Sequence, residues 1–123
     1  MLKPGLTYTT TITVTDNDTA LHIGSGDLPV LATPRMMALM ENAAMNAVAP
    51  LLPKDCTTVG GHIESSHLRP SAVGHTIAAT ATLTQIEGKK LYFNVCALDG
   101  ETVIGKGKHL RFIVNKEQFL SKL

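Results

Sequence analysis

The chain has 123 residues, 44% of them hydrophobic, which suits one domain with an adequate core and no linker, repeat or low-complexity segment. Its formal net charge of +1 and aromatic content of 4% argue against the basic or aromatic-rich surfaces that bind nucleic acid or acidic membranes. We therefore expect a single domain over residues 1–123 whose partners include neither nucleic acid nor a membrane.

The cysteines and the first residues of the chain indicate the cellular compartment to expect. Cys56 and Cys96 lie far apart and outside any C-x-x-C motif, which indicates free thiols in a reducing compartment rather than a disulfide framework. The opening residues M-L-K-P-G-L-T contain no apolar signal segment. The most apolar run, residues 35–52, is interrupted by polar residues and is shorter than the roughly 20 apolar residues of a membrane span. We expect a cytoplasmic protein.

The first half of the chain predicts a strand, a loop and one long helix. Residues 8–15 are rich in Thr and alternate in polarity as a strand does, and D-N-D then supplies a turn. Residues 20–31 are broken by two glycines and a proline, and they predict a loop that could cover a site. The Thr33-Pro34 pair is a good helix start, and prolines near residue 52 end the predicted helix, residues 35–52.

The second half changes to a period of two, which is typical of strands. Four strands are predicted, over residues 59–69, 75–86, 91–98 and 102–114. The turn sequences E-G-K and D-G help to make three consecutive antiparallel connections, and residues 116–123 form a final helical turn. One apolar helix and about five strands, in the order β-α-β-β-β-β, predict an α+β fold in which an antiparallel sheet wraps round the helix.

Glu41 is the only acid in the predicted helix, and most of its neighbours are core residues. A helix with so little polar face is expected to be buried nearly all round. Desolvating an unpaired carboxylate is costly, so such a group persists only through protonation, pairing or use. The alternative is that Glu41 shares a narrow solvent stripe with Asn42 and Asn46. We favour a functional carboxylate.

The strand after the helix reads V-G-G-H-I-E-S-S-H-L-R-P. Counting by twos places His67 on the face of Val59, Gly61 and Ile63. If Ile63 faces the helix, His67 does too. There it would form an acid/base pair with Glu41, because proximity favours both charged forms. Taken alone, an inward histidine is more often structural.

Two neighbouring features have structural as well as functional interpretations. Gly60 and Gly61 would admit a ligand to backbone N–H groups, as an oxyanion site requires, but such a pair is also typical of a bulge or a strand end. Thr33 is best explained by sequence alone as the helix N-cap. That role is compatible with a second role in a site.

The last strand carries cations at alternating positions in G-K-G-K-H-L-R. Lys106 and Lys108 share one face, while His109 and Arg111 share the other. Cations flanked by glycine suit a phosphorylated group such as a nucleotide tail, whereas most strand lysines protect an edge or solvate a face. Both interpretations remain open for this pair.

The sequence predicts no metal and no other cofactor. His62 and His67 lie on opposite strand faces because their spacing is odd, and the chain contains neither H-E-x-x-H nor C-x-x-C. A serine nucleophile is not expected either, because no G-x-S-x-G motif is present.

Three segments, L-A-T-P-R-M-M-A-L-M-E-N-A-A, V-G-G-H-I-E-S-S-H and G-K-G-K-H-L-R-F-I-V, resemble the hotdog-fold thioesterases of the fluoroacetyl-CoA thioesterase type. The match runs from about residue 29 to residue 114, with the T-x7-E spacing and the downstream His in register. The resemblance implies an acyl-CoA substrate and a homodimer with active sites at its interface. It implies that Thr33, Glu41 and His67 are catalytic and that Gly60 and Arg111 bind the substrate. The glycine pair itself adds Gly61 to the expected substrate-binding residues.

One segment departs from the family. The fluoroacetyl-specific member has a Phe-bearing lid just before the catalytic Thr, whereas this chain has G-S-G-D-L-P-V-L there. We therefore predict general hydrolysis of short-chain acyl-CoA to free acid and CoA, with Glu41 as nucleophile or general base and His67 moving protons. The alternatives are a non-catalytic acyl-CoA-binding hotdog module and a hydratase of enoyl thioesters.

Overall fold

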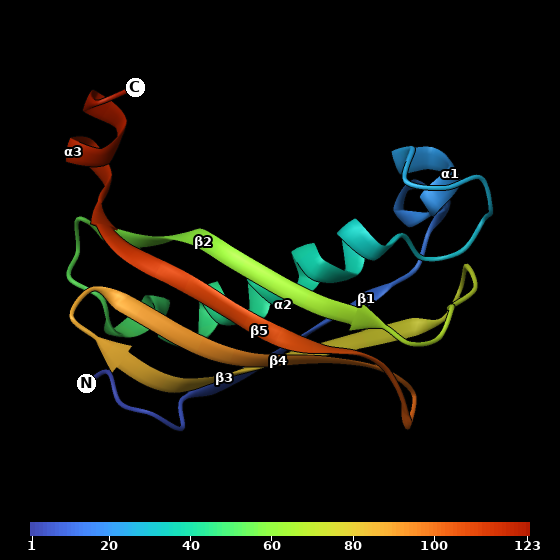
Figure 1. Ribbon diagram of the computed structural model, residues 1–123, viewed down its shortest axis with the longest axis horizontal. Helices are drawn as coiled ribbons and strands as arrows, with labels where there is room; N and C mark the ends of the chain where they lie inside the picture. The colour runs from blue at the N-terminus through green and yellow to red at the C-terminus, as the bar shows by residue number, and fades with distance from the viewer.

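The computed structural model describes residues 1–123 and shows a five-stranded antiparallel sheet curving round one long helix, α2 (Thr33–Val48) (Figure 1). The strands are β1 (Thr7–Thr13), β2 (Cys56–His67), β3 (Thr76–Glu87), β4 (Lys90–Asp99) and β5 (Thr102–Asn115). The short helical segments are η1 (Asp16–Asp18), α1 (Ala20–Ile23), η2 (Ala49–Leu51) and α3 (Lys116–Ser121). The predicted α+β arrangement is confirmed, and the segment expected to be a loop contains the single turn α1.

The core lies between α2 and the face of the sheet that the helix covers, which we call the inner face. Alternate residues of the two central hairpin strands are buried there: Ile77, Ala79, Ala81, Leu83, Leu91, Phe93, Val95 and Ala97. The helix contributes Met36, Leu39, Met40, Ala43, Ala44, Ala47 and Val48. The small alanines of β3 let α2 approach closely. Burial of this apolar area, at roughly 25 cal/mol per Å², is the main term that stabilises the arrangement.

The strand order in the sheet is β1-β3-β4-β5-β2. The hairpins joining β3, β4 and β5 agree with the prediction, and their turns use Gly88 and Gly100 at positive φ of 61° and 62°. The remaining connection differs, because β2 pairs with β5 at the far edge instead of lying beside β3. A period of two identifies the faces of a strand but not its neighbours. The outcome leaves β2 as an edge strand.

A β-bulge interrupts β2. The pairing with β5 shifts between Gly60 and His62, so Gly61 has no partner residue in the register. A Cβ atom on Gly61 would overlap the ring of Phe112, which explains why only glycine fits there. The bulge interpretation of the glycine pair is therefore confirmed for Gly61.

The bulge changes which residues of β2 face the helix. Thr58 and Gly60 lie on the inner face before it, whereas Ile63 and His67 lie there after it. The predicted common face for Val59, Gly61, Ile63 and His67 is therefore wrong for its first two members. One extra residue reverses the alternation.

Within one chain, α2 is buried on one side only. Pro34, Ala38 and Asn42 are exposed, and Glu41 and Met45 are half-buried. The expectation of a helix buried nearly all round is wrong for the single chain, because a single sheet can cover only one side of a helix. Glu41 lies at the boundary between the covered and the open side.

Three further features complete the fold. The helix α3 projects from the end of β5 away from the sheet (Figure 1), and Asn115 caps its first turn by accepting the Gln118 backbone N–H at 3.0 Å. Cys56 and Cys96 are free thiols, as predicted. None of the helices combines the length and apolarity needed to cross a bilayer.

Candidate active site

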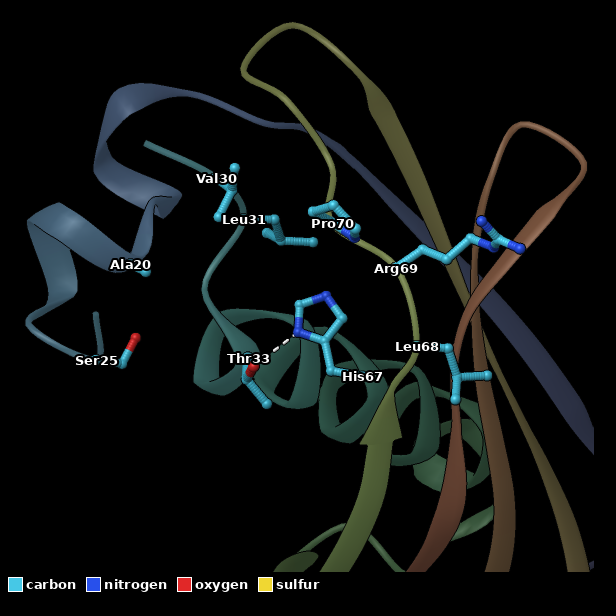
Figure 2. Close-up of a pocket in the computed structure, with 9 residues that line it drawn as sticks. All are labelled: Ala20, Ser25, Val30, Leu31, Thr33, His67, Leu68, Arg69 and Pro70. Atoms are coloured by element: carbon cyan, nitrogen blue, oxygen red, sulfur yellow. Dashed lines mark hydrogen bonds between the residues drawn. The ribbon is translucent and has the colours of Figure 1, made fainter. Parts of the chain in front are cut away.

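The first group of candidate residues lies at the start of α2. Thr33 Oγ1 is 2.7 Å from His67 Nδ1, so the two predicted catalytic residues are hydrogen-bonded (Figure 2). Thr33 is the first residue of the helix, and the N-cap is Ala32, which has no side-chain cap. The N-cap interpretation of Thr33 is therefore wrong. Its hydroxyl is committed to the imidazole instead of to the helix end.

A pocket of about 310 Å³ opens beside the Thr33–His67 pair. Its walls come from α1 and the loop that follows it, the start of α2 and the end of β2, and they include Ser25, Val30 and Leu68 (Figure 2). The segment predicted to cover a site thus lines this pocket. Asp18 anchors the same region, because its Oδ1 accepts a hydrogen bond from Arg35 Nε of α2 at 2.8 Å.

Burial controls the protonation of His67. It lowers the pKa of the imidazole below its ordinary 6.5, and a contact with the Arg69 backbone partly opposes this shift. Nε2 is buried without a hydrogen-bond partner and points toward Leu31 and Pro70 (Figure 2). The lowered pKa favours a neutral ring near pH 7, and a neutral ring can accept a proton.

The second group lies over the middle of α2. Glu41 Oε2 is 3.0 Å from the point where a side chain of Gly60 would begin. His109 Cε1 and Arg111 Nη1 lie 3.5 Å and 3.7 Å from that same point. A carboxylate, an imidazole and a guanidinium therefore converge on the space above Gly60, and we call these four residues the Glu41 cluster. Any side chain at position 60 would intrude on it.

Arg111 and His109 form the rigid part of the Glu41 cluster. They are 6% and 2% exposed. Arg111 donates from Nε to Thr58 Oγ1 at 2.8 Å and from Nη2 to the Thr58 carbonyl at 2.9 Å. Burial lowers the pKa of Arg111, and the charge of Glu41 opposes that shift. Glu41 itself makes no hydrogen bond or ion pair within the chain, so its carboxylate is available for chemistry beside a buried cation.

The two groups do not meet within one chain. No hydrogen bond or ion pair joins Glu41 to His67, and the charge of Glu41 acts on His109 and Arg111 instead. Thr33 and Glu41 are eight residues apart on α2, or about 12 Å along its axis. The inner-face position predicted for His67 is confirmed, but the predicted proximity to Glu41 is not found in the single chain.

Sequence reasoning missed two residues here, one in the Glu41 cluster and one that holds it in place. The alternation in β5 places His109 on the face of Arg111, and that signal was sufficient to include it. Thr58 carried no such signal, because its role depends on the pairing of β2 with β5 and on the bulge that follows it. Gly61 faces away from the Glu41 cluster, so any contribution it makes to ligand binding must come from its backbone.

Lys106 and Lys108 are exposed on the outer face of the sheet, opposite α2 and both groups. They cannot protect an edge, since β5 lies between β4 and β2. Packing explains the glycines that flank them, because a Cβ on Gly105 would lie 2.7 Å from Met36 Sδ and one on Gly107 would lie 2.7 Å from Ser65 Cα. Strand packing thus explains the glycines of this pattern, and the lysines are exposed groups on the outer face.

Comparison with known proteins agrees with this geometry. Residues 14–117 match the family model described as fluoroacetyl-CoA-specific thioesterase. The fluoroacetyl-CoA thioesterase of Streptantibioticus cattleyicolor is 37% identical over 94 residues, which cover 76% of this chain and 68% of that protein.

Solved structures of similar proteins give the same result. A mutant of the fluoroacetyl-CoA thioesterase FlK in complex with acetyl-CoA has a TM-score of 0.93 and 31% identity, covering 98% of this chain and 96% of that one. A Thermus thermophilus thioesterase superfamily member has a TM-score of 0.89 and 26% identity, with coverage of 97% and 88%. The fold is therefore the hotdog fold, and this chain belongs to the fluoroacetyl-CoA-specific thioesterase family and is a thioester hydrolase.

Proposed function

We propose that this thioester hydrolase acts on short-chain acyl-CoA and releases the free acid and CoA, with Glu41 and His67 as catalytic groups. The observation that carries the proposal is the division of the candidate residues into two incomplete halves. One half is a carboxylate beside a buried cation over a glycine, and the other is a hydrogen-bonded Thr–His pair at a pocket. Each half contains groups that thioester hydrolysis needs.

The chemistry uses these groups in one of two ways. Glu41 either removes a proton from water as the water attacks the thioester carbonyl, or attacks that carbonyl itself to form an anhydride that water then opens. In both routes the C–S bond breaks and CoA leaves as a thiolate. Neutral His67 takes up the proton that the attacking water loses and passes it to the sulfur. A backbone N–H near Gly60 would stabilise the oxyanion, because an edge strand leaves some of its N–H groups without a sheet partner.

A homodimer would bring the two halves together. The edge of β2 and the open side of α2, with Ala38, Asn42 and Met45, lie next to Glu41 and are uncovered in the single chain. A second copy placed along this edge would set its own Thr33 and His67 against Glu41. The active site would then lie at the interface, and each dimer would contain two.

The acyl group is the second part of the proposal. A FlK mutant has been solved with acetyl-CoA, and another with fluoroacetate and CoA. The segment of this chain that would cover the pocket has Gly24, Ser25, Gly26 and Asp27. It has no aromatic residue, unlike the Phe-bearing lid expected for a fluoroacetyl-specific enzyme. A pocket of about 310 Å³ covered by small residues suits several short acyl chains.

The primary experiment follows thiol release from acetyl-, propionyl-, butyryl- and fluoroacetyl-CoA with a thiol reagent. Because Cys56 and Cys96 are free, the reagent is first allowed to react with the enzyme alone to set the baseline. Release at rates well above the spontaneous reaction is expected. Saturable binding of acyl-CoA without release would instead identify a non-catalytic binding module.

A second experiment tests the shared site. Thr33→Ala and Glu41→Gln chains, each nearly inactive alone, are mixed under conditions in which subunits exchange. Heterodimers should regain up to about half of the sites of a wild-type dimer, because one of the two sites at their interface would hold an intact Thr33, His67 and Glu41. Failure to recover activity in heterodimers purified with two different affinity tags would place the whole site within one chain.

A further inference from the structure

His109 is the most deeply buried ionisable side chain near the Glu41 cluster, and hydrolysis as proposed above gives it no task. Its ring is 2% exposed, and both ring nitrogens have partners. Nδ1 lies 2.7 Å from the His62 carbonyl oxygen on β2, and Nε2 lies 3.1 Å from Arg111 Nη1.

These two partners determine the state of the ring. A carbonyl oxygen can only accept a hydrogen bond, so Nδ1 must carry a proton. A guanidinium can only donate, so Nε2 must be without one. His109 is therefore a neutral imidazole in its Nδ1–H tautomer.

The same contacts hold Arg111 in one orientation. Thr58 takes hydrogen bonds from Nε and Nη2, and His109 takes one from Nη1. Three bonds at three nitrogens prevent a planar guanidinium from turning. Its Nη1 end is thereby kept 3.7 Å from the point above Gly60 on which Glu41 converges.

We propose that His109 is a positioning residue that holds the Arg111 guanidinium beside Glu41 through a neutral Nε2 acceptor, and that protonation of His109 releases Arg111. This role rests on the proposed function, because it acts through the Glu41 carboxylate. A proton on Nε2 would face the Nη1 donor directly, so the hydrogen bond would be lost and two cations would be in contact.

The groups around His109 favour the neutral form. Burial lowers the pKa of its imidazole, and Arg111 and His62 lower it further. The hydrogen bond to the His62 carbonyl and the charge of Glu41 on α2 act in the opposite direction. From β4 the facing residue is Phe93, whose ring centroid lies 6.2 Å from that of His109 and which does not titrate. Arg111 should thus stay in place at neutral pH and be released only in acid.

The test combines spectroscopy with three variants. Two-dimensional ¹H–¹⁵N spectra of the ligand-free protein report the tautomer of His109 and the Nε–H signal of Arg111 as functions of pH. His109→Gln keeps an acceptor near the Nε2 position but cannot titrate, and His109→Leu removes the acceptor. His62→Gln is the matched control, because it replaces an exposed imidazole and leaves the carbonyl in place.

The expected spectrum shows the neutral Nδ1–H tautomer at pH 7, and the Arg111 signal should shift together with His109 protonation in acid. His109→Leu should lower kcat/KM about tenfold or more, mainly through kcat, while His109→Gln should restore most of this loss and weaken the acid limb of the pH profile. The His62→Gln control should keep the wild-type kcat/KM at pH 7.

Two results overturn the inference. One is the Nε2–H tautomer, or a protonated ring, at pH 7. The other is a folded His109→Leu variant with wild-type kcat and pH profile. The spectra need no substrate, so they can fail while hydrolysis is intact. A protein that shows the expected tautomer but hydrolyses no acyl-CoA would overturn the proposed function instead.

Discussion

The two groups along α2 are built in opposite ways. Thr33 and His67 are joined by one hydrogen bond at the rim of an open pocket. Glu41 lies beside His109 and Arg111, which are buried and held by hydrogen bonds to β2. A charge that must stabilise a reacting group needs a rigid, water-poor frame, whereas a rim that admits substrate needs room. One helix provides both because only one of its sides is covered.

The contrast between the two groups fails most plainly if the carboxylate of Glu41 is dispensable. Glu41→Gln keeps the shape and removes the charge, so kcat should fall by two or more orders of magnitude with little change in the folding or binding of ligand. Steady-state kinetics with acetyl-CoA measure the effect. Glu64→Gln, at an exposed carboxylate on the outer face of β2, is the control and should stay within about twofold of wild type. Near-normal turnover in Glu41→Gln would remove Glu41 from the mechanism.

Substitutions at Gly60 and Gly61 should affect different properties, activity at Gly60 and stability at Gly61. A Cβ at position 60 would press on the end of the Glu41 side chain, so Gly60→Ala should lose roughly tenfold in kcat and keep most of its stability. A Cβ at position 61 would strike the Phe112 ring, so Gly61→Ala should lose about 1–3 kcal/mol of stability and keep its kcat once folded. Thermal melts measure the loss of stability in both variants, and steady-state kinetics measure the loss of turnover. The reverse pattern would mean that the bulge has been assigned to the wrong residue.

Acid should destabilise the buried His109–Arg111 pair more than the Thr33–His67 pair. Burial lowers the pKa of both His67 and His109, so the unfolded chain binds a proton more readily than the folded chain does. Stability is therefore fully present above the ordinary pKa of 6.5 and is lost as the pH falls from there toward the folded-state values. Thermal melts from pH 8 to pH 5 should show this loss, and His109→Gln should reduce it more than His67→Gln does. A melting temperature independent of pH in this range would contradict the expectation.

The smallest effect is expected for acyl-chain selectivity at the pocket beside Thr33 and His67. Discrimination by a methylene or two contributes only about 1–3 kcal/mol even in a shaped pocket. The kcat/KM values for acetyl-, propionyl- and butyryl-CoA should therefore lie within roughly a hundredfold of one another, with no special advantage for a fluorinated acyl group. A preference of many thousandfold for fluoroacetyl-CoA would show that the covering segment is selective without an aromatic residue.

Local patterns were sufficient to predict the helix, the five strands and the inner position of His67. The sheet partner of β2 could not be predicted, because alternation carries no information about neighbours. The exposed side of α2 was also missed, since composition alone does not say how many layers cover a helix. The role of Thr58 depends on the pairing of β2 with β5 and on one bulge, and a single extra residue in a strand has no clear mark in a sequence. His109, by contrast, shares the face of Arg111 by alternation alone.

The bulge at Gly61 makes the number of residues between Gly60 and His67 important for the structure of β2. Because one unpaired residue sits between Gly60 and His67, the part of β2 under Glu41 and the part carrying His67 both face the helix. Deleting that residue would turn one part outward without changing the chemistry of any side chain. A change of length by one, harmless in most surface loops, would therefore leave only one of these two parts facing α2.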